Sequence, residues 1–173
     1  MPTVLALRYP LVARSARRAP KADFFDETYR EMRVLPNDCD FNLHINNGRY
    51  LSLMDLGRID HATRTGWLAT FRARGWNPVA TGVTIRFRRE LRIGTRYRLF
   101  TKLAGWDERW FYFEQRFERA DGLLAARAYV KAAVLDKRRT PMPPATVVAA
   151  LDVDPVSPQL PSDITTWQQI EAG

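Results

Sequence analysis

The spacing of apolar residues changes along the chain and separates helical from extended stretches. From Tyr50 to Ala62 apolar residues recur at roughly helical intervals, which predicts a helix of about four or five turns that ends near Gly66. Gly57 lies inside this stretch, where glycine costs about 1 kcal/mol relative to alanine, so we expect the helix to pack closely on a sheet there. Residues 67–74 predict a second, short helix.

Beyond a break at residues 75–78 the apolar period becomes two. Val83, Ile85 and Phe87 alternate with polar residues, which predicts a strand with one apolar face. Similar patterns predict strands over residues 24–34, 96–105, 110–119 and 123–135. Asp121-Gly122 predicts a two-residue hairpin turn, in which both central residues need positive φ.

One strand, a long helix and four more strands joined largely by hairpins predict an α+β fold. We expect a basic N-terminal arm over residues 1–22, one domain over residues 23–151 and a proline-containing tail over residues 152–173. A short helix is expected within residues 141–151. Ile164 and Trp167 are candidates for fastening the tail to the body or to a partner subunit.

The net charge of +8, from 27 basic and 19 acidic residues, predicts attraction to phosphates, acidic carrier proteins or acidic lipid surfaces. Nucleic acid is not the expected partner, because the basic residues are spread through strands without a recognisable binding motif. We expect the N-terminal arm to be loosely docked. The alternative is weak contact with a membrane surface through an apolar side made by Leu5, Leu7, Tyr9 and Leu11.

Cys39 is the single cysteine, which excludes an intramolecular disulfide and fits a reducing compartment. The sequence has no run of 18 apolar residues that could cross a membrane. The expectation from these features is a cytoplasmic protein.

The polar stretch between Arg33 and Met54 is the strongest candidate for a functional site. Pro36 and the turn residues after it end the first strand. Asn46 or Asn47 is a preferred residue for capping the long helix, and the adjacent Gly48 would let a ligand approach its first turn. The free N–H groups at a helix start stabilise developing negative charge. These residues alone therefore predict a loop carboxylate next to a helix start that can stabilise an anion.

The segment D-C-D-F-N-L-H-I-N-N-G-R-Y resembles the signature of hotdog-fold acyl-CoA thioesterases of the 4-hydroxybenzoyl-CoA thioesterase-like group. Its continuation, G-R-Y-L-S-L-M-D-L-G-R, resembles the subgroup that contains the thioesterase superfamily member 6 proteins. The resemblance implies an antiparallel sheet wrapped around one central helix, and subunits that pair through edge strands as a homodimer or tetramer. Leu43 stands where many relatives have glycine.

The resemblance also implies roles for single residues. Asp40 takes the place of the catalytic carboxylate, as nucleophile or general base, and the backbone N–H near Asn47 would polarise the thioester carbonyl. Tyr50 would be core or pocket wall. An aspartate with an ordinary pKa of about 3.9 is ionised at neutral pH, and a thiol leaving group with a pKa of about 8.5 needs no strong general acid.

Other polar residues of the stretch have more than one reading. His44 could position substrate, hold the loop, or act as the base of a hotdog dehydratase. Asn46 is a cap first, and Asp38 is expected to be a loop cap or a solvent-facing acid. His61 has no acidic ligand cluster nearby, so no metal site is expected.

Coenzyme A would be part of the substrate rather than a separate cofactor. Its phosphates could be held by arginines on or beside one strand, namely Arg86, Arg88, Arg89 and Arg92. The leading prediction is therefore a hydrolase of acyl-CoA or acyl-carrier thioesters. The alternatives are a hotdog domain that binds acyl-CoA or lipid without turnover, and a dehydratase that uses His44.

Overall fold

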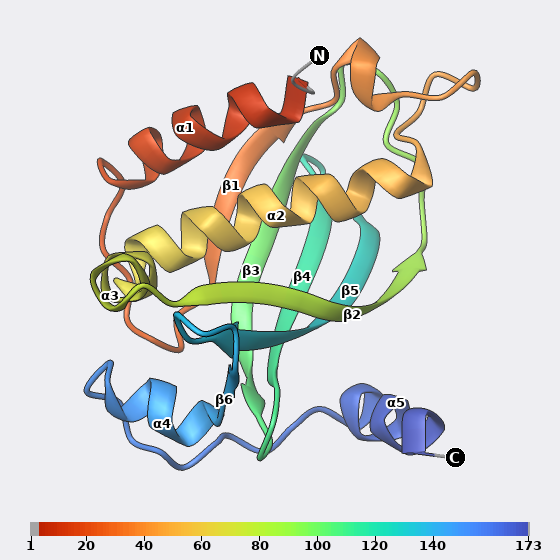
Figure 1. The fold of residues 1–173 in the computed structure, drawn as a ribbon. Coiled ribbons are helices and arrows are strands. Elements are labelled where there is room, and N and C mark those ends of the chain that lie inside the picture. Colours follow the sequence, from red (N-terminus) through yellow and green to blue (C-terminus); the bar gives the residue numbers. More distant parts are fainter. Residues whose placement is uncertain (1–3, 173) are drawn as a thin grey trace.

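The computed structural model describes residues 4–172 (Figure 1). The elements are α1 (Val4–Ala16), β1 (Thr28–Arg33), the 3-10 turn η1 (Pro36–Asp38), α2 (Asn47–Arg64), α3 (Trp67–Arg74), β2 (Asn77–Phe87), β3 (Arg96–Trp106), β4 (Phe111–Arg119), β5 (Leu124–Leu135), β6 (Pro141–Met142), α4 (Pro144–Ala149) and α5 (Ser162–Ala172). Among these helices none has both the length and the apolar character needed to cross a bilayer.

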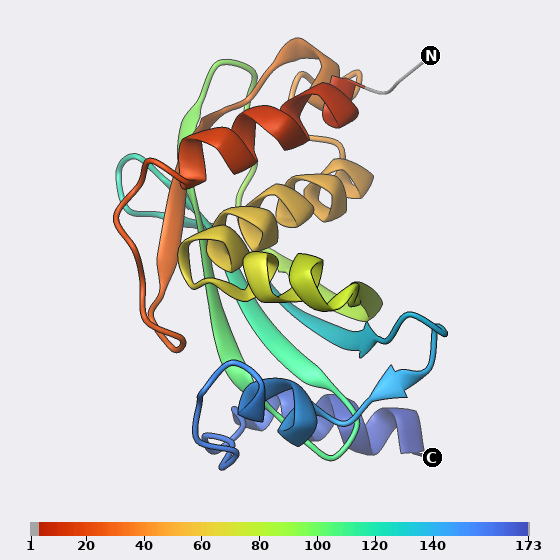
Figure 2. The same ribbon diagram turned by 60° about the vertical axis from the view of Figure 1, so that its left-hand side comes forward.

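The strands form one antiparallel sheet in the order β1-β3-β4-β5-β2, with the short β6 paired to β5. The sheet curves around α2, and α1 lies on the outer side of α2 (Figures 1 and 2). The predicted α+β architecture, a sheet wrapped around a long helix, is confirmed.

The face of α2 that meets the sheet is apolar and closely packed. Leu53 and Met54 are fully buried there, and burying one such side chain stabilises the fold by about 1.5–3 kcal/mol. Gly57 allows the close approach that the sequence predicted, because a Cβ at this position would lie 2.8 Å from the side chains of both Gln115 and Thr101. Gln115 Nε2 in turn donates to the Met54 carbonyl at 3.0 Å, which ties the helix backbone to β4.

The first strand is shorter than predicted and begins at Thr28. The two aromatic residues before it stack on buried tryptophans instead of joining the sheet, with Phe24 partly buried and Phe25 43% exposed. Phe24 stacks on Trp67 with ring centroids 4.9 Å apart, and Phe25 stacks on Trp106 at 6.0 Å. The alternation that predicted a longer strand therefore came partly from aromatic side chains that stack at one end of the core.

The β4–β5 connection also differs from the predicted two-residue turn. The Arg119 N–H donates to the Leu123 carbonyl at 2.9 Å, and the Gly122 N–H donates to the Arg119 carbonyl at 2.9 Å. Only Gly122 has positive φ, at 81°, and Asp121 does not. This is a three-residue loop in which glycine supplies the single left-handed position.

The sequence had led us to expect a loosely docked N-terminal arm, and the structure shows a packed helix instead. Residues 4–16 form α1, which packs along α2 and buries Val12 and Ala16. Leu11 is 66% exposed. The side chains of Leu5 and Leu7 lie outside the described part of the chain, so membrane contact by this segment stays a prediction. The helix continues through Pro10, and packing against α2 stabilises it.

The C-terminal tail is fastened to the body, as predicted, but it ends in a helix. Ile164 of α5 is fully buried, and Trp167 packs over Gly82 of β2 and against Tyr112 of β4. A Cβ at Gly82 would lie 3.0 Å from the Trp167 ring, so the glycine makes room for it. The α5 helix thereby packs on part of the sheet face opposite α2, where Ile164 and Trp167 form a cluster with Ala104, Tyr112 and Tyr129.

Candidate active site

The residues that carried the sequence prediction form a tight hairpin just before α2. Cys39 and Ile45 pair as an antiparallel bridge, and the Asp40 N–H donates to the His44 carbonyl at 3.0 Å. The Leu43 N–H donates to the Asp40 carbonyl at 3.1 Å to close the turn. Leu43 has φ of 60°, the left-handed conformation that favours glycine. The turn before His44 therefore keeps its geometry although the chain carries leucine here.

The Asp40 carboxylate has one oxygen engaged and one free. Oδ1 accepts from the Asn42 N–H at 2.9 Å, and His44 Nδ1 lies 3.5 Å from the same oxygen. The Asp40 side chain is 25% exposed. Oδ2 has no hydrogen-bond partner within residues 4–172. A water molecule or a substrate carbonyl carbon can approach this second oxygen from solvent.

The start of α2 provides hydrogen-bond donors next to this carboxylate. Asn46 caps the helix, since its Oδ1 accepts from the Gly48 N–H at 2.9 Å. A Cβ at Gly48 would lie 3.2 Å from that oxygen, so glycine keeps the cap open. The N–H of Asn47, the first helical residue, has no partner in the part of the chain that the structure describes. Asn47 and Gly48 are both exposed, which leaves a free donor at a positive helix end.

Asp38 has a different environment from the one expected. It is fully buried and forms ion pairs with Arg8 of α1 at 3.0 Å and Arg49 of α2 at 3.1 Å. Its Oδ2 also accepts from the Leu35 N–H at 3.3 Å, so its role as a loop cap is confirmed, whereas a solvent-facing position is wrong. Arg8 belongs to the segment that was expected to be a loosely docked arm. Sequence reasoning therefore missed this cluster.

Cys39, between the two aspartates, is partly buried, and its Sγ donates to the Leu35 carbonyl at 3.5 Å. Burial, with the neighbouring Asp38 and Asp40 charges, raises the pKa of the thiol. A raised pKa makes the reactive thiolate scarcer at neutral pH, which fits a packing role for this cysteine. Residues 4–172 contain no cluster of His, Cys, Asp and Glu that could hold a metal ion.

Tyr50 lies in the core, where its ring packs edge-on against Phe87 and Phe117 with centroids 5.0 and 4.8 Å away. Only 3% of the residue is exposed, and burial raises the pKa of its phenol to about 12. Of the two readings that the sequence left open, core or pocket wall, the structure supports the core. Its contribution to substrate binding stays a prediction.

The structure does not bring the arginines together at the hairpin. Phe87 faces Tyr50 and α2, so its neighbour Arg86 points to the opposite side of the sheet, where it borders a hollow with Asp163 of α5. Arg88 is exposed just beyond the end of β2. Arg92, in contrast, pairs through its backbone with His44. Alternation along the strand could have separated Arg86 from the hairpin at the outset.

Comparison with known sequences identifies the family of this architecture. A sequence model described as the thioesterase-like superfamily matches residues 34–151. Protein THEM6 of Danio rerio is 41% identical over 110 residues, which are 63% of this chain and 54% of that protein. Protein THEM6 of Xenopus laevis is 36% identical over 165 residues, which are 93% of this chain and 77% of that protein. The chain thus spans only about half the length of the first of these relatives.

Solved structures show the same fold at low sequence identity. The probable thioesterase YbaW from Escherichia coli superimposes with a TM-score of 0.65 at 17% identity, covering 71% of this chain and 97% of that one. The hypothetical protein SAV2348 from Staphylococcus aureus, in complex with CoA, superimposes with a TM-score of 0.62 at 14% identity, covering 83% of this chain and 95% of that one. The fold is therefore the hotdog fold. The regions around α1 and α5 lie outside the matched family region.

Proposed function

This chain belongs to the thioesterase-like superfamily, and we propose that it hydrolyses acyl thioesters of coenzyme A or of an acyl-carrier protein with Asp40 as the reacting carboxylate. One observation carries the proposal. The partly exposed Asp40 has a free Oδ2 and lies in the hairpin that leads directly into α2, where the Asn47 N–H is unpaired within the described residues. A carboxylate and an oxyanion donor are what thioester hydrolysis needs.

The chemistry divides between these two groups. The Asn47 N–H would donate a hydrogen bond to the thioester oxygen as negative charge develops there. Such a donor is worth roughly 3 kcal/mol in the transition state. Asp40 Oδ2 either attacks the carbonyl carbon and forms an anhydride that water cleaves, or removes a proton from the attacking water. In both cases the C–S bond breaks and the thiolate leaves without a strong general acid, because thiols have a pKa of about 8.5. The Asn42 N–H holds Oδ1, and His44 Nδ1 lies 3.5 Å from the same oxygen, so Oδ2 is the oxygen left for the substrate.

Replacing Asp40 tests the proposal directly. We expect Asp40→Asn to lower kcat for thiol release by roughly 100-fold or more, the lower range for losing a catalytic base, and Asp40→Ala to do the same. Asp154→Asn is the matched control. Asp154 Oδ1 accepts an N–H two residues ahead at 2.9 Å, as Asp40 Oδ1 does, but it lies in the C-terminal tail. Equal rates in the wild type and both Asp40 variants would remove Asp40 from the mechanism.

Substrate phosphates would find positive charge beside the hairpin at Arg92, whose backbone pairs with His44, whereas Arg86 lies on the other face of the sheet. We expect Arg92→Ala to raise KM for acyl-CoA several-fold and to leave kcat unchanged, because a phosphate contact acts equally in the ground and transition states. Arg86→Ala serves as the control. An equal rise in KM for both variants would argue against local recognition by Arg92.

Pairing of two copies through β2 fits the exposed surface. β2 lies at an edge of the sheet and pairs with β5 alone among the described strands. Val83 and Phe87 on this strand and Phe41 at the hairpin tip are exposed, and Phe41 is exposed completely. We propose a homodimer that covers this edge. Light scattering should give twice the mass of the chain, and Val83→Glu should shift the protein toward the monomer; a wild-type monomer at micromolar concentration would contradict the proposal.

A dehydratase is the second candidate, and the distance of 3.5 Å between His44 Nδ1 and Asp40 Oδ1 favours it, because a carboxylate can orient a histidine base. The two reactions separate experimentally. Water loss from a 3-hydroxyacyl-CoA creates a conjugated absorbance without free thiol, whereas hydrolysis releases thiol. Loss of dehydration in His44→Gln, with no thiol release in the wild type, would favour the dehydratase. Binding of acyl-CoA with neither product would favour a non-catalytic binding protein.

A further inference from the structure

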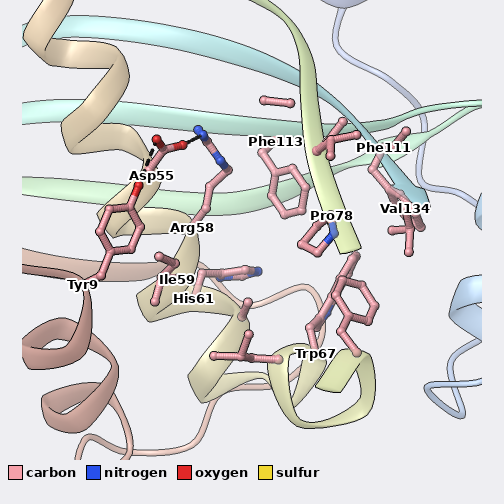
Figure 3. Close-up of a pocket in the computed structure, with 17 residues that line it drawn as sticks. Tyr9, Asp55, Arg58, Ile59, His61, Trp67, Pro78, Phe111, Phe113 and Val134 are labelled. Carbon is pink, nitrogen blue, oxygen red and sulfur yellow. Dashed lines mark hydrogen bonds and ion pairs between the residues drawn. The ribbon is translucent and has the colours of Figure 1, made fainter. Parts of the chain in front are cut away.

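A cavity of about 320 Å³ lies between α2, α3 and the β2–β5 side of the sheet, away from the Asp40 hairpin (Figure 3). No residue of the 38–50 segment lines it. Its lining on α2 begins at Asp55 and reaches His61 and Ala62. At 1.5 Å per residue these positions lie about 12–22 Å along the helix axis from Asn47. The cavity is therefore a separate feature from the carboxylate and the helix start.

The walls of the cavity are apolar and strongly aromatic. Trp67 meets Phe111 edge-on with centroids 5.2 Å apart and Phe71 at 5.6 Å, and Phe113 lies 5.8 Å from Trp67. Pro78 of β2 closes one side. Cavities of about half this volume in an apolar core bind small hydrocarbons, so this one has room for a small organic molecule.

Two polar atoms in this apolar lining lack partners within residues 4–172, namely His61 Nε2 and Trp67 Nε1. Both residues are buried, with 1% and 3% of their surface exposed. The His61 ring projects from α2 toward the space beside Phe113 and Pro78 (Figure 3). Native proteins rarely leave buried polar groups unpaired, and each such group costs about 1–3 kcal/mol. A bound ligand that pairs them would recover this free energy.

The other nitrogen of His61 shows what Nε2 can do. His61 Nδ1 lies 3.1 Å from Thr28 Oγ1, and that hydroxyl also lies 3.4 Å from the Thr101 carbonyl, to which it can only donate. When the Thr28 hydroxyl donates to that carbonyl, the His61 proton is on Nδ1 and Nε2 is an acceptor. Trp67 Nε1 can only donate. A hydroxyl group satisfies both, because it accepts from the tryptophan and donates to the histidine.

The charged groups at the cavity are already neutralised. Arg58 forms an ion pair with Asp55 and donates to Gln115 Oε1 at 2.7 Å, and the Tyr9 hydroxyl donates to Asp55 at 3.1 Å. Burial and the nearby Arg64 lower the pKa of His61 to about 4, so the imidazole is uncharged at neutral pH. A neutral ligand fits this lining better than a carboxylate or an amine, since neither would find a free opposite charge.

We propose that this cavity is a binding site for a neutral, mainly apolar molecule with a hydroxyl group that is held between Trp67 and His61. The hydroxyl could belong to a free lipid alcohol or to the far end of an acyl chain whose thioester lies at Asp40. The two sources share one chemistry, and the site is defined by its own residues whether or not the chain hydrolyses thioesters.

Calorimetric titration with three probes tests the site. Octan-1-ol should bind one-to-one and saturably, and 1-methoxyheptane, which has the same number of heavy atoms but cannot donate, should bind about tenfold more weakly, the effect of one hydrogen bond. Octanoate should also bind more weakly than the alcohol. Absence of saturable octan-1-ol binding, or equal affinity for the alcohol and the ether, would overturn the proposal.

Variants locate the binding. Ala62→Leu fills part of the cavity at a partly exposed helix position and should reduce octan-1-ol affinity at least tenfold. Trp67→Phe keeps an aromatic ring but removes the N–H donor, so octan-1-ol affinity should fall several-fold. Trp106→Phe is the matched control, because Trp106 is also buried yet does not line the cavity. Circular dichroism confirms folding of each variant. Unchanged affinity in both Ala62→Leu and Trp67→Phe would place the probe elsewhere and overturn the proposal.

A kinetic arm separates the two sources of the hydroxyl. If octan-1-ol raises KM for 12-hydroxydodecanoyl-CoA without changing kcat, the occupant is the end of the acyl chain. If it leaves KM unchanged while calorimetry shows binding, the occupant is a free lipid alcohol. Both results support the site. Calorimetry with octan-1-ol needs no turnover and can also be done on Asp40→Asn. The cavity proposal can therefore be tested even if the chain does not hydrolyse thioesters, and the two proposals can be refuted independently.

Discussion

The carboxylates on either side of Cys39 occupy opposite environments although they are two residues apart. Asp38 is fully buried between Arg8 and Arg49, whereas Asp40 is 25% exposed and keeps one oxygen free. The first joins α1, the η1 turn and α2. The second is presented to solvent by a turn that needs only local backbone hydrogen bonds. Structural and chemical roles are therefore divided between neighbouring aspartates.

The division has a physical reason. A buried carboxylate is stable only when cations and N–H donors replace its lost hydration, and Asp38 has both. Such a fully occupied group has no free oxygen for a substrate. Asp40 stays 25% exposed and has one oxygen without a partner in residues 4–172, so it can act on a ligand. The burial of Asp38 fixes the segment from which the Asp40 hairpin projects.

The largest expected effect is the loss of stability on removing the buried charge. Asp38→Asn should lower the free energy of unfolding by about 3–5 kcal/mol, because it leaves two arginines without their partner in a buried site. Asp40→Asn should change it by less than about 0.5 kcal/mol, as for an ordinary surface position. Urea unfolding followed by circular dichroism measures both. Comparable losses in the two variants would contradict the division of roles.

His61 extends the comparison to a buried group that has no opposite charge. Burial and Arg64 lower its pKa from 6.5 to about 4, against a smaller opposing effect of Asp26. As pH falls below 6.5, His61 binds a proton in the unfolded chain, whereas in the folded chain it binds one only near pH 4. The free energy of unfolding therefore has its full value above pH 6.5 and decreases by about 2–3 kcal/mol as pH falls toward 4.

His61→Gln should remove this part of the pH dependence, because glutamine does not titrate. Urea unfolding at pH 7 and pH 4.5 gives the loss for each protein, and the comparison with the wild type cancels the titration of carboxylates. An identical loss in the wild type and His61→Gln would mean that His61 is protonated in the folded state at pH 4.5.

Removing one of the two cations should have a smaller effect than removing Asp38. Arg8→Ala leaves Arg49 and the Leu35 N–H on the carboxylate, so we expect a loss of about 1–2 kcal/mol, the range of one charge-assisted hydrogen bond. Arg14→Ala, an exposed position on the same helix, is the control and should be neutral. Thermal unfolding compares the two. No difference between them would show that α1 does not stabilise the Asp38 cluster.

The smallest effect concerns the Asp40 turn itself. Leu43 has φ of 60°, a conformation that costs a side-chain-bearing residue about 1 kcal/mol, so Leu43→Gly should stabilise the protein by up to that amount. Leu123→Gly is the matched control. Leu123 is similarly exposed but lacks positive φ, and its replacement should destabilise the protein slightly. If Leu43→Gly also destabilises, the leucine side chain makes contacts that outweigh the strain.

The sequence predicted the elements whose signals are local. α3 has the predicted limits because Gly66 and Gly75 supply left-handed residues at its two ends, and α2 follows a clear helical period. Asp40, His44 and Asn46 could be placed together because they are contiguous in the chain. The position of the proposed reacting carboxylate therefore needed no knowledge of tertiary structure.

What the sequence did not predict depends on distant contacts. Asp38 is buried by partners that lie 30 residues before it and 11 residues after it, and no local pattern contains that information. α1 is stabilised by packing on α2 and by the ion pair of Arg8. The local sequence pattern contains neither contact, so it predicted a loosely docked arm. His61 Nε2 and Trp67 Nε1, which lack partners in the described part of the chain, come to one cavity only when α2 and α3 pack together.

The attachment of α1 has a practical consequence for anyone who prepares this protein. A recombinant version that starts after Ala16 would withdraw a cation from Asp38 and would also remove Tyr9 from the mouth of the cavity. Low yield or weak turnover from such a trimmed sample would reflect the truncation and not the native chemistry.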